Sequence, residues 1–308
     1  MFVFLHVPKT AGKTLVSVIE SKHTARWAEF KKDQWNPQAA AQAVREWDQL
    51  HPDALQIFHG HQHYGIDAYL STPVTYYTML RDPTERVISH YYFVLRDHIL
   101  SDRRQGIKNN HPDRLRVQQG GLSLKDYVAT GYCAEMDNGQ TRQLAGESGL
   151  YDRVPFGQCT PDLLELAKKN LSRQMGVVGL TEEFDASLLL IQRLCGWSTP
   201  YYLSRNITPH RPRQADLPPD TLRAIEERTT LDRQLYDYGT QLFRERVAAQ
   251  GPGFADDLWR FQESNRRYGA WHVRRAAALR TLRRAGRFAS DHLPRWVGRS
   301  AARGKCPI

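Results

Sequence analysis

Short apolar runs alternate along the chain with longer segments in which apolar residues recur every three or four positions. Four runs have the length and composition of buried strands: residues 2–6, 55–61, 74–80 and 174–180. Helical spacing predicts helices over residues 13–22, 38–50 and 84–97, and another after Thr181, which we expect to cap it. This alternation predicts an α/β fold with a mainly parallel sheet.

The carboxyl-terminal part continues in helical spacing without further strands. The stretch ADLPPD (215–220) precedes a predicted long helix over residues 220–247, and AQGPGF (249–254) has the composition of a linker. Residues 258–293 predict a basic amphipathic helix that ends at Pro294. We therefore expect a main domain over residues 1–250 and a basic helical extension over residues 251–308.

The net charge of +10 is concentrated in this extension. Residues 258–308 hold 13 of the 43 Lys and Arg residues and 2 of the 33 Asp and Glu residues, which leaves 30 basic and 31 acidic residues in 1–257. Three interpretations stay open: the extension packs on the main domain, contacts an anionic membrane surface, or binds an acidic polymer or partner through residues 258–305. Specific recognition of nucleic acid is not expected.

No run is apolar for long enough to span a bilayer, and the first residues lack the pattern of a secretory signal. We therefore expect a cytoplasmic protein, with any membrane contact at the inner face. The four cysteines, Cys133, Cys159, Cys195 and Cys306, show no CxxC pair and no histidine at zinc-ligand spacing. Reduced thiols are favoured, although sequence leaves a bond between Cys133 and Cys159 open.

The segment FVFLHVPKTAGKTL (2–15) runs from a predicted strand through a loop into a predicted helix. Gly12 permits a tight backbone, and the side chains that supply donors are Lys9, Thr10, Lys13 and Thr14. The start of the helix adds free N–H groups and the positive end of its dipole. The sequence therefore predicts a phosphate-binding loop rather than an ordinary strand-to-helix turn.

The nucleoside triphosphatase loop GxxxxGK[ST] fits this segment only in part. GKT at 12–14 matches its end, but Val7 stands where the first glycine should be. Pro8 also removes one backbone N–H donor. Both departures weigh against ATP or GTP chemistry.

HVPKTAGKT resembles instead the 5′-phosphosulfate loop of sulfotransferases that use 3′-phosphoadenylyl sulfate (PAPS). It is most similar to the branch of the heparan sulfate 2-O- and 6-O-sulfotransferases and their bacterial relatives. There the loop reads approximately H-[IV]-P-K-T-[AG]-G-T-[ST], so the family lysine corresponds to Lys9, and Lys13 replaces a threonine. The resemblance spans about residues 2–247. It implies a P-loop-like three-layer fold whose donor-binding residues include Lys9, Thr10, Ala11, Gly12, Lys13 and Thr14.

A second segment, TMLRDPTERVISHYYF (78–93), resembles the 3′-phosphate element of the same family. Arg81 ends a predicted strand, at the edge of the sheet where ligands bind in open α/β folds. Ser89 lies about two turns into the next helix and can face the same crevice. A bidentate arginine contact and a serine hydroxyl would together bind the 3′-phosphate. The alternative is a local Arg81–Asp82 ion pair with Ser89 on the helix surface.

Three histidines in FHGHQHYG (58–65) form the candidate base segment. H-x-H at His59 and His61 could bind zinc, but no convincing partner set is visible. The segment resembles the one that carries the catalytic histidine of the 2-O-sulfotransferases, with His61 at the position of the base and His59 as the alternative. A neutral imidazole can take the proton of an attacking hydroxyl. His63 has no counterpart in that comparison and is a weaker candidate for substrate binding.

Two further segments resemble parts of the family that line the cleft. EMDNGQTRQLAG (135–146) offers Asn138, Gln140 and Arg142 as candidate substrate-binding residues, or a capped helix with surface polar residues. RNITPHRPR (205–213) resembles the loop over the nucleotide, with Arg211, and less strongly Arg213, as phosphate contacts.

The resemblance implies a metal-independent enzyme that transfers a sulfuryl group from PAPS to a hydroxyl acceptor, with a carbohydrate or glycan favoured. The bisphosphate product, 3′-phosphoadenosine 5′-phosphate (PAP), would leave with its new charge stabilised by Lys9. Two alternatives stay open: a P-loop-type ATP-dependent kinase, and a non-catalytic nucleotide-fold module tethered by its basic tail.

Overall fold

A computed structural model describes residues 1–21, 26–29, 36–50, 55–95, 117, 120–150, 152–198, 201–203 and 211–292. Its centre is a five-stranded sheet in the order β2-β3-β1-β4-β5, in which every neighbouring pair is parallel. The strands are β1 (Phe2–Leu5), β2 (Arg26–Glu29), β3 (Leu55–Gly60), β4 (Thr75–Leu80) and β5 (Met175–Leu180). The predicted α/β class and its parallel sheet are confirmed.

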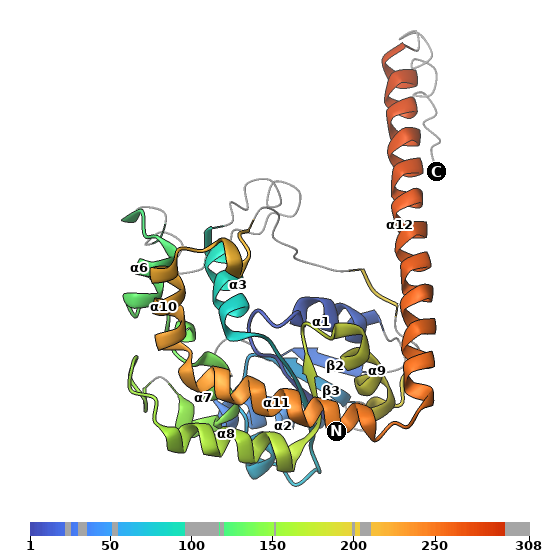
Figure 1. Ribbon diagram of the computed structural model, residues 1–308. Coiled ribbons are helices and arrows are strands. Elements are labelled where there is room, and N and C mark those ends of the chain that lie inside the picture. The colour runs from blue at the N-terminus through green and yellow to red at the C-terminus, as the bar shows by residue number, and fades with distance from the viewer. Residues whose placement is uncertain are drawn as a thin grey trace, which may run out of the picture. The chain divides into compact units, whose positions relative to one another are not determined.

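Helices cover both faces of the sheet, as parallel strands require for their crossovers (Figure 1). In Figure 1, α1 (Gly12–Ser21) and α9 (Phe184–Cys195) lie above the strands, and α8 (Pro161–Gln174) and α11 (Thr230–Ala248) lie below them. The other α-helices of the main unit are α2 (Pro37–Leu50), α3 (Pro83–Leu95), α6 (Leu124–Ala129), α7 (Gly139–Leu144) and α10 (Pro219–Arg228). The molecule therefore has the three-layer architecture that the family resemblance implies.

The apolar runs of the sequence become the middle layer. Val3, Phe4 and Leu5 on β1 have no exposed surface, and the apolar side chains of β4 are buried as well. A second cluster joins α3, α6 and α10 through residues such as Ile88, Tyr127 and Ile225. The first cluster thus supports the strands, and the second supports α3, the helix that follows β4.

Three local expectations need correction. The short strand β2 was not predicted, and the helix predicted over residues 220–247 is two helices, α10 and α11, with a break at Thr229. Thr181 does not cap α9; its N–H and its hydroxyl both donate to Leu80 O, at 2.8 and 2.9 Å. Thr181 therefore joins the ends of β4 and β5.

The chain divides into two compact units, Met1–Gln262 and Glu263–Ile308. The helix α12 (Gly253–His292) begins in the first unit, where Phe254 and Phe261 are buried in the core. Arg193 Nη2 lies 2.6 Å from Asp257 Oδ2 and adds an ion pair to this contact. The main unit thus extends through the first turns of the predicted basic extension.

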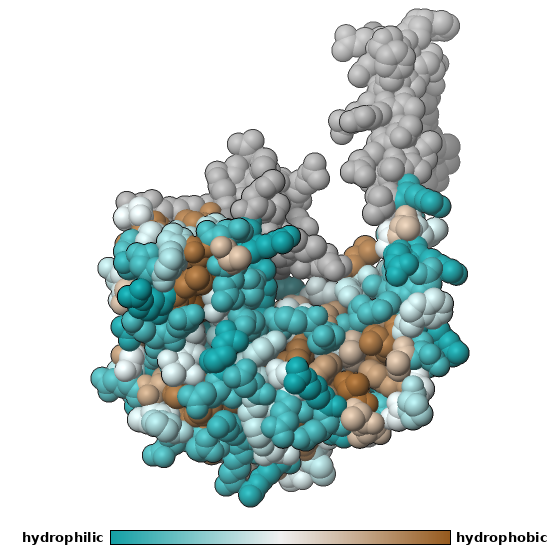
Figure 2. Space-filling view, viewed as in Figure 1, coloured by the Kyte–Doolittle hydropathy of each residue, from teal (hydrophilic) through white to brown (hydrophobic). Residues whose placement is uncertain are grey.

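The surface of the main unit that faces the viewer in Figure 2 is mostly hydrophilic, with apolar residues in small groups. No helix in the described part of the chain is long and apolar enough to cross a membrane. Cys133, Cys159 and Cys195 are free thiols, so the Cys133–Cys159 disulfide does not form, and Cys306 lies outside the described residues.

Candidate active site

The predicted phosphate loop joins the end of β1 to the start of α1, and its backbone is tightly wound. Lys9 and Ala11 have positive φ angles of 70° and 60°, a conformation that costs a non-glycine residue about 1–2 kcal/mol. The Thr10 hydroxyl donates to Val7 O at 2.8 Å, and Thr14 N donates to Ala11 O at 2.9 Å. These bonds hold a strained loop directly before the helix, where free N–H groups can bind an anion.

Gly12 is required by a close neighbour rather than by its own φ angle. A Cβ at this position would lie 1.8 Å from His6 Nε2. The buried His6 ring lies between Phe4 and His61, with ring centroids 5.2 and 4.3 Å away. The first residue of α1 therefore packs directly against the histidine that ends the β1 segment.

The two lysines of the loop differ in their surroundings. Lys9 is partly buried, and its Nζ lies 4.0 Å from the centroid of the Phe93 ring on α3. Lys13 is exposed on the first turn of α1. Both lysines contribute to lowering the pKa of His6, so the loop creates a positive potential at the carboxyl end of β1.

Arg81 and Arg211 come together at the end of β4. Glu85 Oε2 accepts from Arg211 Nη2 at 2.7 Å and from Arg81 Nη2 at 3.5 Å. Burial and the neighbouring Arg211 lower the pKa of Arg81. Arg81 Nη1 also donates to Lys9 O at 3.1 Å, which links the two predicted phosphate elements. Two guanidinium groups that share one carboxylate form a cationic cluster suited to a phosphate.

Ser89 lies on α3 and is half-buried, and its predicted contact with the 3′-phosphate stays a prediction. Gln140 takes a different position from the one expected for an acceptor contact. Its side-chain amide pairs with the backbone of Arg81, accepting from Arg81 N at 3.0 Å and donating to Arg81 O at 2.9 Å.

His61 lies at the end of β3, beside the phosphate loop. Leu5, the last residue of β1, is paired with Gly60, the last residue of β3. His61 directly follows Gly60 and therefore lies next to the end of β1. Its Nδ1 lies 2.8 Å from His6 O. Because a carbonyl oxygen only accepts, Nδ1 carries a proton, and the lone pair of the neutral ring is on Nε2. That is the tautomer required of a general base that acts through Nε2.

The other histidines of the segment are buried. Burial, with a smaller contribution from His61, lowers the pKa of His59 from 6.5 to about 4, so this ring is neutral at pH 7. Burial is also the main cause of the lowered pKa of His6. His63 is almost fully buried. No group of three metal-ligating side chains lies together in the part of the chain that the structure describes.

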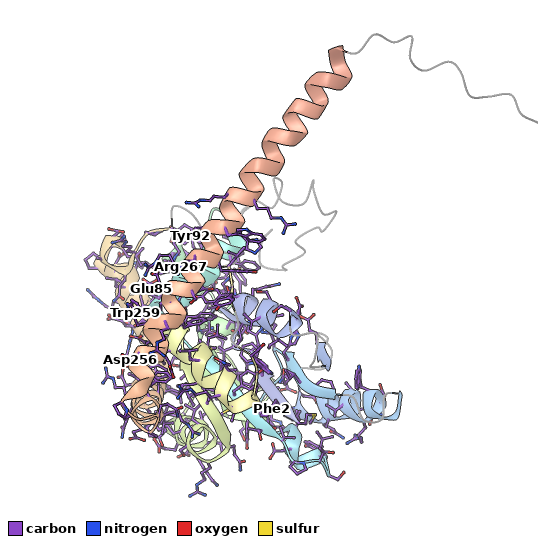
Figure 3. The ribbon with its side chains drawn as sticks, turned by 90° about the vertical axis from the view of Figure 1, so that its right-hand side faces the viewer. Phe2, Glu85, Tyr92, Asp256, Trp259 and Arg267 are labelled. Atoms are coloured by element: carbon purple, nitrogen blue, oxygen red, sulfur yellow. The ribbon has the colours of Figure 1, made fainter. Side chains whose placement is uncertain are left out.

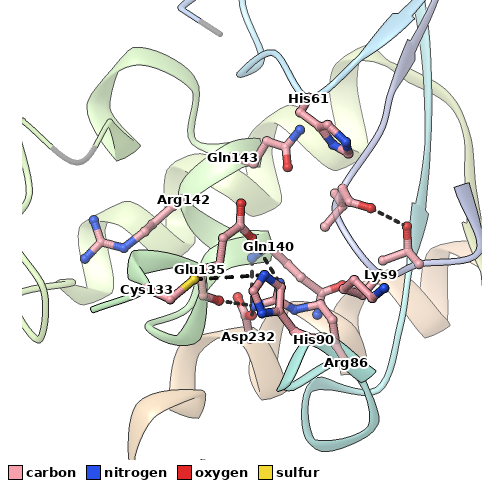
Figure 4. A network of polar contacts seen from close by, with 12 residues as sticks. Lys9, His61, Arg86, His90, Cys133, Glu135, Gln140, Arg142, Gln143 and Asp232 are labelled. Carbon is pink, nitrogen blue, oxygen red and sulfur yellow. Dashed lines mark hydrogen bonds and ion pairs between the residues drawn. The ribbon is translucent and has the colours of Figure 1, made fainter. Parts of the chain in front are cut away.

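Asn138 and Arg142 belong to a buried polar network, of which Figure 4 shows Arg142, Arg86, Glu135 and Asp232. The Asn138 side-chain oxygen accepts from the backbone of α11 at Leu231 N, 2.9 Å, and Asp232 N, 3.1 Å. Arg142 has no exposed surface and donates to Asp137 O at 2.8 Å and Val154 O at 2.6 Å. Both side chains therefore have a structural role.

The same network holds α3, α7 and α11 together. Asp232 accepts from Thr141 N and Thr141 Oγ1, both at 2.8 Å, and lies 3.5 Å from Arg86 Nη2. Arg86 Nη1 lies 3.2 Å from Glu135 Oε2. A buried arginine with carboxylate partners fixes the start of α3, the helix that follows Arg81.

Sequence reasoning did not single out His6, Glu85, Phe93 or Gln143, although all four contact a predicted site residue or its supporting backbone. Only the positions of two of these residues in the sequence could have indicated them: His6 directly follows β1, and Glu85 is one helical turn from Arg81. Arg213 lies outside the arginine pair, where its N–H donates to Asp216 Oδ2 at 2.8 Å. Residues 204–210 lie outside the described residues.

The candidate groups thus follow three adjacent strands, β3, β1 and β4, at their carboxyl ends. His61 follows β3, Lys9 follows β1, and Arg81 follows β4, where Arg211 joins it. This edge is where open α/β sheets bind ligands. The arrangement can bind an anionic ligand with several phosphate groups and present a base beside it.

Comparisons with known proteins agree with this geometry. Residues 1–145 match the model of the sulfotransferase family. Heparan-sulfate 6-O-sulfotransferase 1 of Homo sapiens is 34% identical over 194 residues, which cover 58% of this chain and 46% of that protein. Heparan-sulfate 6-O-sulfotransferase 1-B of Danio rerio is 34% identical over 184 residues, covering 56% and 44%.

Heparan-sulfate 6-O-sulfotransferase 3 of Mus musculus is 31% identical over 189 residues, which cover 56% of this chain and 38% of that relative. The chain spans less than half the length of these curated relatives. The matched residues include the phosphate loop, the histidine segment and the Arg81 element. The resemblance that the sequence motifs indicated is therefore confirmed: residues 1–145 are similar to the sulfotransferase family.

Proposed function

We propose that the protein is an enzyme that transfers a sulfuryl group from PAPS to a hydroxyl group of a glycan. One observation carries this proposal: a loop lysine, a pair of arginines and a histidine in the tautomer of a base meet at the ends of three adjacent strands. The names of the curated relatives favour a carbohydrate acceptor. Arg81 and Arg211 suit the 3′-phosphate, and Lys9 with the start of α1 suits the 5′-phosphosulfate.

The reaction assigns one role to each group. His61 Nε2 takes the proton of the acceptor hydroxyl while the oxygen of that hydroxyl forms a bond to the sulfur of PAPS. The bond between sulfur and the bridging oxygen of the 5′-phosphate breaks, and its electron pair stays on that oxygen as PAP leaves. The ammonium group of Lys9 stabilises this new charge. Positioning and charge stabilisation supply most of the catalysis, as in phosphoryl transfer, and the absence of a metal requirement stays a prediction.

The test uses purified full-length protein, PAPS and 6-O-desulfated heparan sulfate, with release of PAP as the readout. We expect His61→Ala to lower turnover by about 10²–10⁴-fold, as expected for loss of a general base, while PAP affinity changes little. Lys9→Ala should also lower turnover strongly with the fold intact. Lys168→Ala is the matched control, because Lys168 lies on α8, where its Nζ pairs with Glu165 Oε1 at 2.9 Å. Near-normal turnover in His61→Ala would exclude His61 as the base.

We also propose that residues 258–305 contact an anionic membrane surface. Trp271 is 53% exposed, and Arg266 and Arg267 are exposed on the same helix, α12, which also carries Trp259 (Figure 3). Exposed tryptophan and arginine together are typical of helices that lie at lipid interfaces. The full chain should sediment with vesicles of anionic lipid and remain free with neutral vesicles. Retention by heparin without vesicle binding would favour the acidic polymer instead. The expected location at the inner face of a membrane stays a prediction.

A further inference from the structure

The helix α7 presents two glutamine side chains, Gln140 and Gln143, to the two halves of the candidate site. They are three positions apart, so they lie on neighbouring parts of one helix face. Both side chains are almost completely buried, and neither needs to reach the acceptor to affect the site. Figure 4 shows Gln143 beside His61 and Gln140 farther along the helix toward Arg86.

Gln143 joins the segments on both sides of the candidate base. Its Nε2 donates to His6 O at 3.2 Å and to Gln62 O at 2.9 Å, and its backbone O accepts from Tyr64 N at 3.0 Å. His6 O is also the oxygen that accepts from His61 Nδ1 at 2.8 Å. One amide therefore fixes the carbonyl that sets the His61 tautomer, together with the chain directly after His61.

Gln140 acts in the same way on the donor side. Its amide makes two hydrogen bonds to Arg81, at the N–H and the C=O, as a neighbouring strand would. Asp232 Oδ2 accepts from Gln140 N at 3.2 Å and anchors this position to α11. Arg81 leaves the sheet at this point, so the pair of bonds defines where its guanidinium begins.

We propose that Gln143 is a positioning residue for the base and Gln140 a positioning residue for the donor 3′-phosphate. The effect on catalysis rests on the proposed function. The effect on the His61 ring and on the Arg81 backbone can be measured without it. Each buried amide makes two hydrogen bonds to backbone groups, and an apolar side chain in its place would remove both bonds. The two glutamines should therefore have separable effects.

The test compares Gln143→Leu with Gln140→Leu, two matched changes on one helix. In full-length protein labelled with ¹⁵N-histidine, the His61 signal is assigned by its loss in His61→Gln. In the wild type at a pH where the ring is neutral, we expect protonated Nδ1 and unprotonated Nε2. Gln143→Leu should give a mixture of tautomers, and Gln140→Leu should leave the tautomer unchanged.

Two further measurements distinguish a positioning role from a general loss of structure in the variants. Calorimetry should show PAP affinity lowered about 10-fold, which corresponds to about 1.4 kcal/mol, in Gln140→Leu and within about threefold of wild type in Gln143→Leu. Turnover at saturating PAPS should fall about 10–100-fold in Gln143→Leu. A merely structural role would lower both properties together in both variants.

The outcomes are decisive even if a variant does not fold. A wild-type His61 ring protonated on Nε2 overturns the role of Gln143 without any variant. Gln143→Glu keeps the side-chain length but loses the donor, and an unchanged tautomer in either folded variant also overturns that role. Unchanged PAP affinity in Gln140→Leu overturns the role of Gln140. Absence of sulfuryl transfer in the wild type would refute the proposed function, while the tautomer would still decide the positioning of His61.

Discussion

At the scale of single residues, the predicted site residues are held in place by neighbouring side chains that the sequence did not indicate. The sequence motifs indicated Lys9, Arg81 and His61 through their family resemblance, and each of these residues follows an apolar strand. Their partners Phe93, Glu85 and His6 could not be chosen from sequence, because each contact depends on how a helix or strand packs. Arg142 shows the opposite case: an arginine in a family-like segment is buried among backbone carbonyls.

The buried histidines make stability depend on pH. His59 has a pKa of about 4 in the folded protein against 6.5 in the unfolded chain, so the unfolded state binds the extra proton between these values. Stability is therefore fully present above pH 6.5 and is lost as the pH falls toward 4, by on the order of 3 kcal/mol through His59 alone. The lowered pKa of His6 acts in the same direction.

Urea unfolding at pH 7.5 and pH 5 measures this effect. The wild type should lose stability at pH 5, and His59→Gln should lose less between the two pH values because it cannot take up the proton. An equal loss in both proteins would show that His59 titrates normally in the folded state.

At the scale of elements, the strands were the most predictable part of the fold. Continuous apolar runs mark β1, β3, β4 and β5. Strands that are buried on both faces are apolar on both, so apolar and polar residues do not alternate along them. The edge strand β2 has the sequence RWAE, which carries no such run. The break at Thr229 between α10 and α11 has no glycine or proline to mark it. The support that α7 gives to both halves of the site depends on tertiary contacts alone.

At the junction of β1, the phosphate loop and α1, adding one methyl group at Gly12 should strongly affect stability. Gly12→Ala places a Cβ against the His6 ring, which is itself packed between two other rings. We expect a loss of about 1–3 kcal/mol in the free energy of unfolding, together with weaker PAP binding.

Gly253→Ala is the matched control. Gly253 also begins a helix, but apart from its chain neighbours and the backbone of its own helix, no atom of the described residues lies within 4 Å of the place that its Cβ would take. Thermal and urea unfolding of the two variants compare the sites. Equal stability of Gly12→Ala and Gly253→Ala would contradict the close packing of His6 against α1.

At the scale of the whole molecule, sequence composition separated a nearly neutral main unit from a basic carboxyl-terminal segment. The structure likewise divides the chain, at Gln262, and buries Phe254 and Phe261 from the start of α12 in the first unit. The helical period predicted α12, but the point at which its packing on the core ends could not be read from composition. The domain limits of 250 and 251 stay a prediction.

The central claim is that the main unit binds a nucleotide through its 3′-phosphate. The most direct measurement is calorimetric titration of the full-length protein with PAP, beside ATP and 5′-AMP with magnesium, for the wild type, Arg81→Ala and the surface control Arg153→Ala. We predict preferential binding of PAP, and a loss of about 10–100-fold in Arg81→Ala alone, because hydrogen bonds to a charged group contribute about 1.5–3 kcal/mol. Tighter binding of ATP than of PAP, or equal PAP affinity in all three proteins, would contradict the account.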